Sequence, residues 1–498
     1  MSAISTARRP EIKTELPGPR GREIVAADAR WVTPSYPRPD YKLVAERASG
    51  VWVEDVDGNT FLDCNAGVAV CSTGHCHPEV VRAIQEQAAS LIHMCGTDYY
   101  YRHMPDLGRK LEEIVPVEGP TKTHFANSGT EAVETALKLA MHATGRQKFI
   151  SFFNSFHGRT LGSLSLTSSR VAQRRGFRRS VLDVTHVPYP NTFRHPFTGE
   201  QSDGETVSRA VLDWIEQRLF LTTTPPEEVA AVVVEAVQGE GGYVPAPREF
   251  LHGLRRICDE HGILLVVDEV QSGFGRTGKM FACEHYGVKA DVVTLAKGIA
   301  SGIPMGACVA RADLMDWKPG AHASTFGGNP VAIAAALKTI ELLEGGLVAN
   351  SAAVGAHLEE GLRRLSARHD CIGDVRGFGM MLGVEFVADR ESREPAPDLR
   401  DRVEVECFRR GLILLGAGYN AIRWSPPLVL SRENADVALE IFDEAIAAAA
   451  ELGPPVDRFF DEVLVMDEDE RVRANRLRLL LDVRDAVAAL GDLSQIPR

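Results

Sequence analysis

Two short apolar runs between Ile263 and Met305 constrain the fold more than any other feature of the sequence. The run 263–267 is followed by Asp268, and the run 292–296 is followed by Lys297. Each run has the length of a buried strand, and its continuous apolar pattern is typical of a parallel sheet covered on both faces. Ligands of open α/β sheets bind at the carboxyl ends of the strands. The sequence therefore predicts that the Asp268 carboxylate and the Lys297 amine project into one crevice.

This pair of charged groups has a specific chemical use. A lysine amine condenses with an aldehyde to give a Schiff base, and desolvation helps by lowering the pKa of the amine. A carboxylate can hold a proton on a pyridine nitrogen, so the two groups together are those that a pyridoxal phosphate site needs. For these two residues in isolation, the more common alternative is that Asp268 caps the next element and Lys297 is solvated. The choice between a cofactor site and this alternative therefore depends on the other motifs.

Composition narrows the class of protein. The chain has 498 residues, 44% hydrophobic and 25% charged, enough for one large or two to three ordinary globular domains. The net charge of −13 argues against a nucleic-acid surface. Nine scattered cysteines without paired spacing favour a reduced, cytoplasmic protein. No apolar run reaches the roughly 20 residues of a membrane span, and residues 1–22 are expected to form a polar arm rather than a transit peptide.

The N-terminal part predicts a hairpin, a loop and a helix. Gly50–Asp63 alternates and contains an Asp-Gly turn, so we expect a β-hairpin there. The loop that follows carries His75, Cys76 and His77. Three adjacent ligands on regular backbone cannot all face one ion, so no metal site is predicted. A helix is expected over Pro78–Ile92, with its proline near the start.

A candidate phosphate seat lies within Thr121–Thr144. A short strand leads into Ser128, Gly129, Thr130 and Glu131, and the serine and the glutamate have the spacing of a capping box. A helix that starts at such a turn presents free backbone N–H groups and the positive end of its dipole. The sequence thus predicts either a phosphate-binding turn or, as is more common for this spacing, an ordinary helix cap.

Further polar residues follow other predicted strands. Phe156 and Arg159 come after the strand that begins at Phe149. The aromatic ring could stack on a flat cofactor, and the guanidinium could bind a substrate carboxylate; a core phenylalanine and a surface ion pair are the alternatives. Another buried strand ends in Glu235, and a Gly-rich loop with Glu240 follows it. Glu235 is therefore expected beside Asp268.

The remainder of the chain supplies two more candidates and a change of pattern. Thr325 precedes a Gly-containing turn and is either a phosphate donor or a plain turn residue, and Arg423 lies on a strand as a possible carboxylate holder. Strands and helices alternate over residues 120–310, which predicts a doubly wound or similar parallel sheet. Residues 352–450 instead combine long amphipathic helices with short strands.

Six motifs, in this order, resemble those of the class III, pyridoxal-phosphate-dependent aminotransferases, the family of 4-aminobutyrate, ornithine and acetylornithine aminotransferases. They are NSGTEA, FHGRT, EAVQGEGG, DEVQSGFGRTG, LAKGI and TFGGNP, and the match runs from about Gly50 to Ala450. The resemblance implies fold type I: a large α/β domain with a mostly parallel sheet and a smaller α+β domain built from both chain ends. It also implies a homodimer with active sites at the subunit interface.

This resemblance divides the chain into five parts. The expected parts are an arm (1–22), the N-terminal part of the small domain (23–84), the large cofactor-binding domain (85–340), the C-terminal part of the small domain (341–452) and a helical appendage (453–498). The end of the chain, 455–498, is similar to the end of the bacterial glycyl-tRNA synthetase β subunit. We interpret it as a structural appendage, because its acidic run 467–470 argues against RNA contact.

The resemblance also implies roles for the cofactor residues. Lys297 is expected to form the Schiff base and Asp268 to bind the pyridinium nitrogen. The other residues expected to bind the cofactor are Gly129 and Thr130 with Ser128 at the phosphate, Thr325 at the phosphate of the neighbouring subunit's cofactor, Phe156 and Val270 on the ring, Gln271 near its phenolic oxygen, and Glu235 beside Asp268.

Four residues are expected to meet the substrate. Arg159 resembles the arginine that binds a distal carboxylate in some members of the family. Glu240 and Arg423 resemble a switch pair: the arginine binds an α-carboxylate, and the glutamate neutralises it when an ω-amino donor is bound. Val68 stands where ornithine-using members often carry a tyrosine, which argues against ornithine as the donor.

The expected activity is transfer of an amino group from an amino acid or ω-amino acid to a 2-oxo acid such as 2-oxoglutarate. The phrases HASTFGGNPVA and GLILLGAGYNAIRWSPPL look most like an archaeal-type branch that also contains amino-acid racemases. A pyridoxal-phosphate-dependent racemase on the same fold therefore remains the alternative.

Overall fold

The computed structural model describes residues 8–39, 41–177 and 181–462. The first residues of the predicted arm and most of the predicted C-terminal appendage, with its resemblance to a synthetase, lie outside these ranges.

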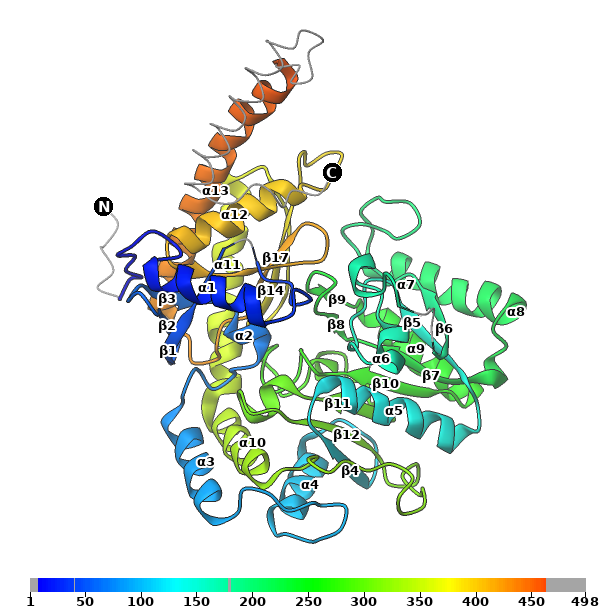
Figure 1. Ribbon diagram of the computed structural model, residues 1–498. Helices are drawn as coiled ribbons and strands as arrows, with labels where there is room; N and C mark the ends of the chain where they lie inside the picture. Colours follow the sequence, from blue (N-terminus) through cyan, green and yellow to red (C-terminus); the bar gives the residue numbers. More distant parts are fainter. Residues whose placement is uncertain (1–7, 40, 178–180, 463–498) are drawn as a thin grey trace.

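A large sheet forms the centre of the molecule (Figure 1). Within the described residues its seven strands have the order β4 (Thr121–Ala126), β12 (Gly306–Arg311), β11 (Val292–Leu295), β10 (Leu264–Asp268), β7 (Val229–Val234), β5 (Lys148–Phe152) and β6 (Asp183–Val187). Only β12 runs against its neighbours. The predicted mostly parallel sheet and the α/β fold class are therefore confirmed.

The continuous apolar strands are explained by helices on both faces. Every residue of β7, β10 and β11 is buried. Val233 and Val266 pack in one cluster with Leu137 of α5 (Gly129–Thr144), whereas the neighbouring Leu265 packs in the other with Leu254 of α9 (Arg248–His261). Successive side chains of a strand point to opposite faces, so both faces need apolar residues.

The other α-helices are α1 (Pro19–Trp31), α2 (Ala66–Ala69), α3 (Pro78–Ser90), α4 (His103–Ile114), α6 (Leu161–Leu166), α7 (Gly204–Asp213), α8 (Phe220–Thr222), α10 (Pro330–Leu342), α11 (Val348–Arg368), α12 (Pro397–Arg409) and α13 (Arg432–Glu462). The predicted helix after Pro78 corresponds to α3. No helix among the described residues is long and apolar enough to cross a membrane.

Three smaller sheets contain the remaining strands. One has the order β1 (Ala45–Ser49), β2 (Trp52–Asp55), β3 (Thr60–Asp63) and β15 (Leu412–Ile413); another has the order β13 (Ile372–Phe378), β14 (Met381–Phe386), β17 (Ala421–Trp424) and β16 (Leu415–Ala417); β8 (Val237–Gln238) pairs with β9 (Val244–Pro245). The predicted hairpin is β2–β3. Because β3 pairs with β15, the two ends of the chain meet in one sheet, and Figure 1 shows the blue N-terminal strands beside the yellow and orange elements.

The five-part division of the chain remains a proposal. Each of its four boundaries falls inside a continuous helix: α1, α3, α10 and α13, respectively. Each of these helices therefore contributes residues to both of the parts that it joins.

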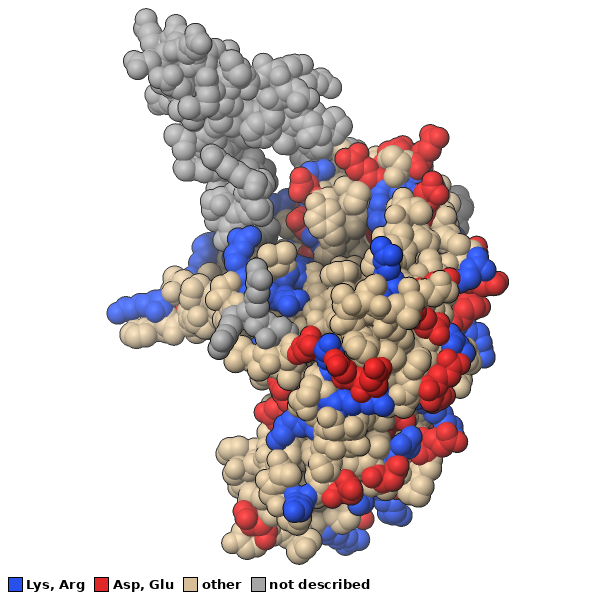
Figure 2. Space-filling view, turned by 90° about the vertical axis from the view of Figure 1, so that its right-hand side faces the viewer, with Lys and Arg blue, Asp and Glu red and all other residues tan. Residues whose placement is uncertain are grey.

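On the face shown in Figure 2, acidic and basic side chains are interspersed among the described residues.

Candidate active site

The loops that follow five strands converge at the carboxyl edge of the large sheet. The parallel strands β5, β7, β10 and β11 all end there, and so does β4, because β12 reverses the direction twice across the sheet. The predicted site residues Ser128, Phe156, Glu235, Asp268 and Lys297 stand at or just after these five ends. This is the edge at which open α/β sheets bind ligands.

Asp268 makes a buried pair with a histidine that the sequence analysis did not single out. His157 Nδ1 lies 2.7 Å from Asp268 Oδ2, and the Val270 N–H donates to Oδ1 at 3.0 Å. Burial alone would lower the pKa of His157, but the hydrogen bond to Asp268 and the charges of Asp268 and Glu235 raise it above its ordinary value. His157 thus holds the Asp268 side chain in place at the end of β10. Its place inside the FHGRT motif was the available signal.

Glu235 ties two loops together. Its carboxylate accepts hydrogen bonds from the Phe156 N–H at 3.0 Å and from the Gly239 N–H at 2.8 Å. Burial, reinforced by the charge of Asp268 and opposed by His157, raises the pKa of Glu235 to about 7. The effect of the Asp268 charge on Glu235 agrees with the expectation that the two carboxyl groups lie near each other. The hydrogen bond from the Phe156 N–H to Glu235 fixes the backbone that carries Phe156.

Lys297 is held in a strained and desolvated position. It opens a 3₁₀ turn, Lys297–Ala300, with φ of 47°, in the left-handed region that side chains rarely adopt. Burial and then the positive charge of Arg423 lower the pKa of the amine to about 8, against the opposing effect of nearby carboxylates. Its ammonium group has no hydrogen-bond or ion-pair partner among the described residues. A lysine with a lowered pKa supplies the neutral amine that attacks a carbonyl.

The start of α5 has the predicted capping arrangement, shifted by one residue. The Ser128 hydroxyl accepts from the Glu131 N–H at 3.3 Å, while the Glu131 carboxylate accepts from the Asn127 N–H at 2.8 Å rather than from Ser128. The Thr130 hydroxyl lies 2.6 Å from that of Ser163. Hydroxyl groups and the positive end of a helix dipole therefore meet at this turn.

Gly129, Val270 and Ala296 pack together at the same turn. A Cβ atom on Gly129 would lie 2.8 Å from Val270 Cγ1 and 3.5 Å from Ala296 Cβ. Only glycine lets the helix start approach Val270 and the residue before Lys297 this closely. Next to Val270, Gln271 accepts a hydrogen bond from the Tyr243 hydroxyl at 2.9 Å. Tyr243 was not singled out from the sequence, and no motif marked it.

Two predicted residues, Arg159 and Thr325, are exposed, and a third, Val68, is half-buried. The Arg159 guanidinium is 5.5 Å from the centre of the Phe156 ring and is exposed. Thr325 is also exposed in the single chain, where a role at a neighbouring subunit would place it. Val68 lies in α2, a turn whose residues 66–69 all have φ between 51° and 68°. A left-handed conformation of a β-branched residue is strained.

Arg423 and Glu240, the two residues of the predicted switch pair, form an ion pair, and a third residue joins it. Arg423 Nη1 donates to Glu240 Oε2 at 3.1 Å, while Arg170 Nε lies 3.2 Å from Glu240 Oε1. The Glu240 carbonyl accepts from the Gly418 N–H at 2.7 Å, which joins the Gly-rich loop to the region of β17. Arg170 lies in an ordinary polar stretch, and no sequence motif marks it.

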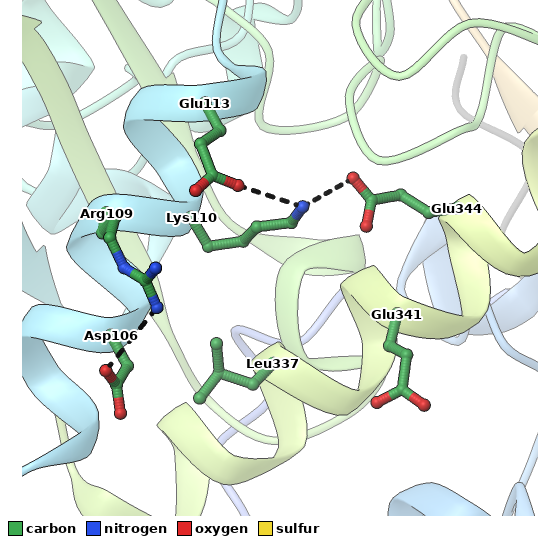
Figure 3. Close-up of a pocket in the computed structure, with 7 residues that line it drawn as sticks. All are labelled: Asp106, Arg109, Lys110, Glu113, Leu337, Glu341 and Glu344. Atoms are coloured by element: carbon green, nitrogen blue, oxygen red, sulfur yellow. Dashed lines mark hydrogen bonds and ion pairs between the residues drawn. The ribbon is translucent and has the colours of Figure 1, made fainter.

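A separate hollow of about 360 Å³ lies between α4 and α10. Charged side chains line it, and Lys110 Nζ contacts Glu344 at 2.8 Å and Glu113 at 3.3 Å (Figure 3). Lys110 thus pairs with two carboxylates at the surface, and none of these groups lies at the carboxyl edge of the sheet. The hollow is therefore not the candidate active site.

Known proteins are similar to this chain in sequence and in fold. The chain matches the family model for class III aminotransferases over residues 35–446. It is 40% identical to the alanine/serine racemase of Pyrococcus horikoshii over 88% of this chain and 92% of that one, and 37% identical to the 4-aminobutyrate aminotransferase of Escherichia coli over 81% and 94%. A pyridoxal-phosphate-bound amine transaminase from an uncultivated Pseudomonas species has a TM-score of 0.77 and 31% identity, with 84% and 98% of the two chains covered. The chain belongs to the class III aminotransferase family and is a pyridoxal-phosphate-dependent transaminase.

Proposed function

We propose that the enzyme moves an amino group from an α- or ω-amino acid to a 2-oxo acid such as 2-oxoglutarate. The ion pair between Glu240 and Arg423 carries this proposal, because it gives the site two states. Released, Arg423 can bind a carboxylate next to the reacting carbon. Closed, the pair presents no free charge to a donor that has no carboxylate there.

The residues at the edge of the sheet fit pyridoxal phosphate. The unpartnered Lys297 amine suits the aldehyde carbon, and the Asp268 carboxylate, supported by His157, suits the ring nitrogen. The remaining groups suit the rest of the cofactor: Ser128, Gly129 and Thr130 at the phosphate, Phe156 and Val270 at the ring faces, and Gln271 near the phenolic oxygen. Thr325 would contribute from the partner subunit.

Bound pyridoxal phosphate supplies an electron-poor ring that stabilises negative charge on the carbon beside the reacting amine. Lys297 Nζ would remove the proton from the substrate carbon that carries the reacting amine, as a general base, and would deliver it to the carbon of the cofactor's aldehyde group, as a general acid. A pKa of about 8 suits both roles near neutral pH. Asp268, held by the His157 ring and the Val270 N–H, would keep the proton on the pyridine nitrogen of the cofactor.

The proposal also assigns the substrate carboxylates to residues. Arg423 binds the α-carboxylate of an acceptor or α-amino donor after Glu240 moves away. With an ω-amino donor Glu240 stays on Arg423, and Arg159 binds the distant carboxylate. Val68 lies at the wall of this region in our proposal.

A donor screen tests the proposal. The purified holoenzyme is incubated with 2-oxoglutarate and 4-aminobutyrate, 5-aminovalerate, acetylornithine, ornithine or L-alanine, and glutamate is measured. We expect glutamate from at least one ω-amino donor, weak use of ornithine, and no product with Lys297→Ala. Absence of glutamate from every donor, with the cofactor bound, would contradict the proposed reaction.

Racemisation is the second candidate, because the relative with 40% identity is named a racemase. A racemase returns the proton to the opposite face of the same carbon and consumes no 2-oxo acid. Chiral chromatography of L-alanine or L-serine incubated without an acceptor separates the two reactions. Formation of the D-isomer up to an equimolar mixture of the two isomers would favour the racemase.

We further propose a homodimer. Segments 92–101 and 322–329 lie side by side, since Thr97 Oγ1 donates to Ser324 O at 3.4 Å and the His93 and Phe326 rings are 5.1 Å apart. Together they expose five large apolar side chains, those of Ile92, Met94, Tyr99, Tyr100 and Phe326. Exposed apolar patches mark interaction sites, and this one flanks Thr325. Light scattering should give a dimer, and Tyr100→Glu should weaken it.

A cytoplasmic location is also proposed. All nine cysteines are free. Unpaired thiols suit a reducing compartment, and fractionation of the cells that make the protein tests this proposal.

A further inference from the structure

We propose that Arg170 determines substrate preference by holding Glu240 when Arg423 is released to bind a substrate carboxylate. Arg170 is thus a positioning residue that acts through Glu240. The inference rests on the proposed function, because it assigns the third member of the switch pair described above.

The contacts place Glu240 between two guanidinium groups. Its Oε2 accepts from Arg423 at 3.1 Å, and its Oε1 lies 3.2 Å from Arg170 Nε. The Arg423 side chain is 8% exposed, that of Glu240 19% and that of Arg170 45%. Glu240 therefore joins an inner arginine to an outer one, and each of its oxygens faces a different cation.

The backbone on both sides of this cluster is fixed, so only side chains can exchange partners. Arg423 is paired in register with Gly383 of β14 and Leu415 of β16. Beside Glu240, Gly241 packs closely on the Asn154 carbonyl oxygen, since a Cβ atom on Gly241 would lie 2.7 Å from it. In the proposal, Arg423 is released by rotation of the Glu240 side chain toward Arg170.

Arg170 changes the free energy of that rotation. Without it, Glu240 would leave Arg423 as a largely buried carboxylate with no cation, which is unfavourable. With it, the carboxylate keeps one ion-pair partner in both states.

Two classes of substrate should respond differently. A 2-oxo acid or α-amino acid has its carboxylate next to the reacting carbon and needs Arg423 free, so it should depend on Arg170. An ω-amino donor binds with the pair closed, so it should not. Arg170 would thereby bias the enzyme toward its acceptor and toward α-amino acids.

The test measures binding as well as turnover. Calorimetry gives the Kd of 2-oxoglutarate, and separately of pyruvate, for the pyridoxal phosphate form of the holoenzyme, which has no amino group to transfer. We expect Arg170→Ala to raise Kd about fivefold to tenfold, and Arg170→Lys, which keeps the charge, to stay within about twofold of wild type. The KM for these acids should rise with little change in kcat, whereas the KM for an ω-amino donor should not rise.

A double-mutant comparison shows whether Arg170 acts through Glu240. In the Glu240→Ala background, Arg170→Ala should produce no further loss of affinity. An equal loss in both backgrounds would mean direct contact with the substrate and would overturn the proposal, as would an unchanged Kd in Arg170→Ala or absence of binding to the wild type. If the binding shifts occur but no donor yields glutamate, the proposed transamination fails and the inference about Arg170 stands.

Discussion

Replacing Lys297 by methionine tests whether the reactive amine destabilises the fold that holds it. Burial first, and the positive charge of Arg423 second, lower the pKa of this amine from 10.5 to about 8. In the cofactor-free protein near neutral pH, the amine is thus charged in a place that disfavours its charge. Unfolding relieves this effect. Methionine has a similar length and no charge, so Lys297→Met should abolish activity and stabilise the cofactor-free protein.

The lowered pKa sets the magnitude of the stabilisation. From 10.5 to about 8 is a shift of about 2.5 units, and at about 1.4 kcal/mol per unit this gives at most about 3 kcal/mol near pH 7. Because the folded pKa lies below the unfolded one, the unfolded chain binds more protons between pH 8 and 10.5, and wild-type stability rises with pH there. The advantage of the variant should therefore shrink to about 1 kcal/mol near pH 9.5.

Urea unfolding of the cofactor-free proteins near pH 7 and near pH 9.5 measures both quantities. The matched control is Lys289→Met, since Lys289 is exposed and lies away from the carboxyl edge of the sheet. The control should match the wild type at both pH values. Two results would refute the reasoning: a Lys297→Met protein less stable than the wild type near pH 7, or an advantage that does not shrink as the pH rises.

Three further substitutions test other parts of the site. His157→Leu removes the hydrogen-bond partner of the buried Asp268 carboxyl group, so thermal unfolding of the cofactor-free protein should show a loss of about 1–3 kcal/mol and kcat should fall; a wild-type kcat would contradict the role of this pair. Gly129→Ala forces a methyl group within 2.8 Å of Val270 and so displaces the proposed phosphate-binding turn. The Kd for pyridoxal phosphate, measured by absorbance, should therefore rise, and an unchanged Kd would show that the turn accommodates the methyl group without moving. Val68→Gly removes a side chain from a residue with φ of 68°, so urea unfolding should show a gain of about 1 kcal/mol, whereas a loss would mean that packing outweighs the strain.

The sequence determined that β7, β10 and β11 are buried strands of the central sheet and which groups stand at their ends, but it did not mark β6 or β12. Runs that are apolar at every position had to be buried on both faces, and β7, β10 and β11 are so buried. The charged residue after each run then had to lie at the carboxyl edge. The helix start at Ser128 followed from local hydrogen-bonding rules in the same way.

Only the tertiary structure decided which of these groups touch. His157 and Asp268 are 111 residues apart, and they meet because β5 lies two strands from β10 in the sheet. Arg170 contacts Glu240 from a loop that carries no motif. The left-handed backbone conformation of Lys297 cannot be predicted from its residue type. Spacing along a chain reports the period of one helix or strand, but strand order and loop paths are set by the packing of the whole core, so contacts between loops come only from the folded molecule.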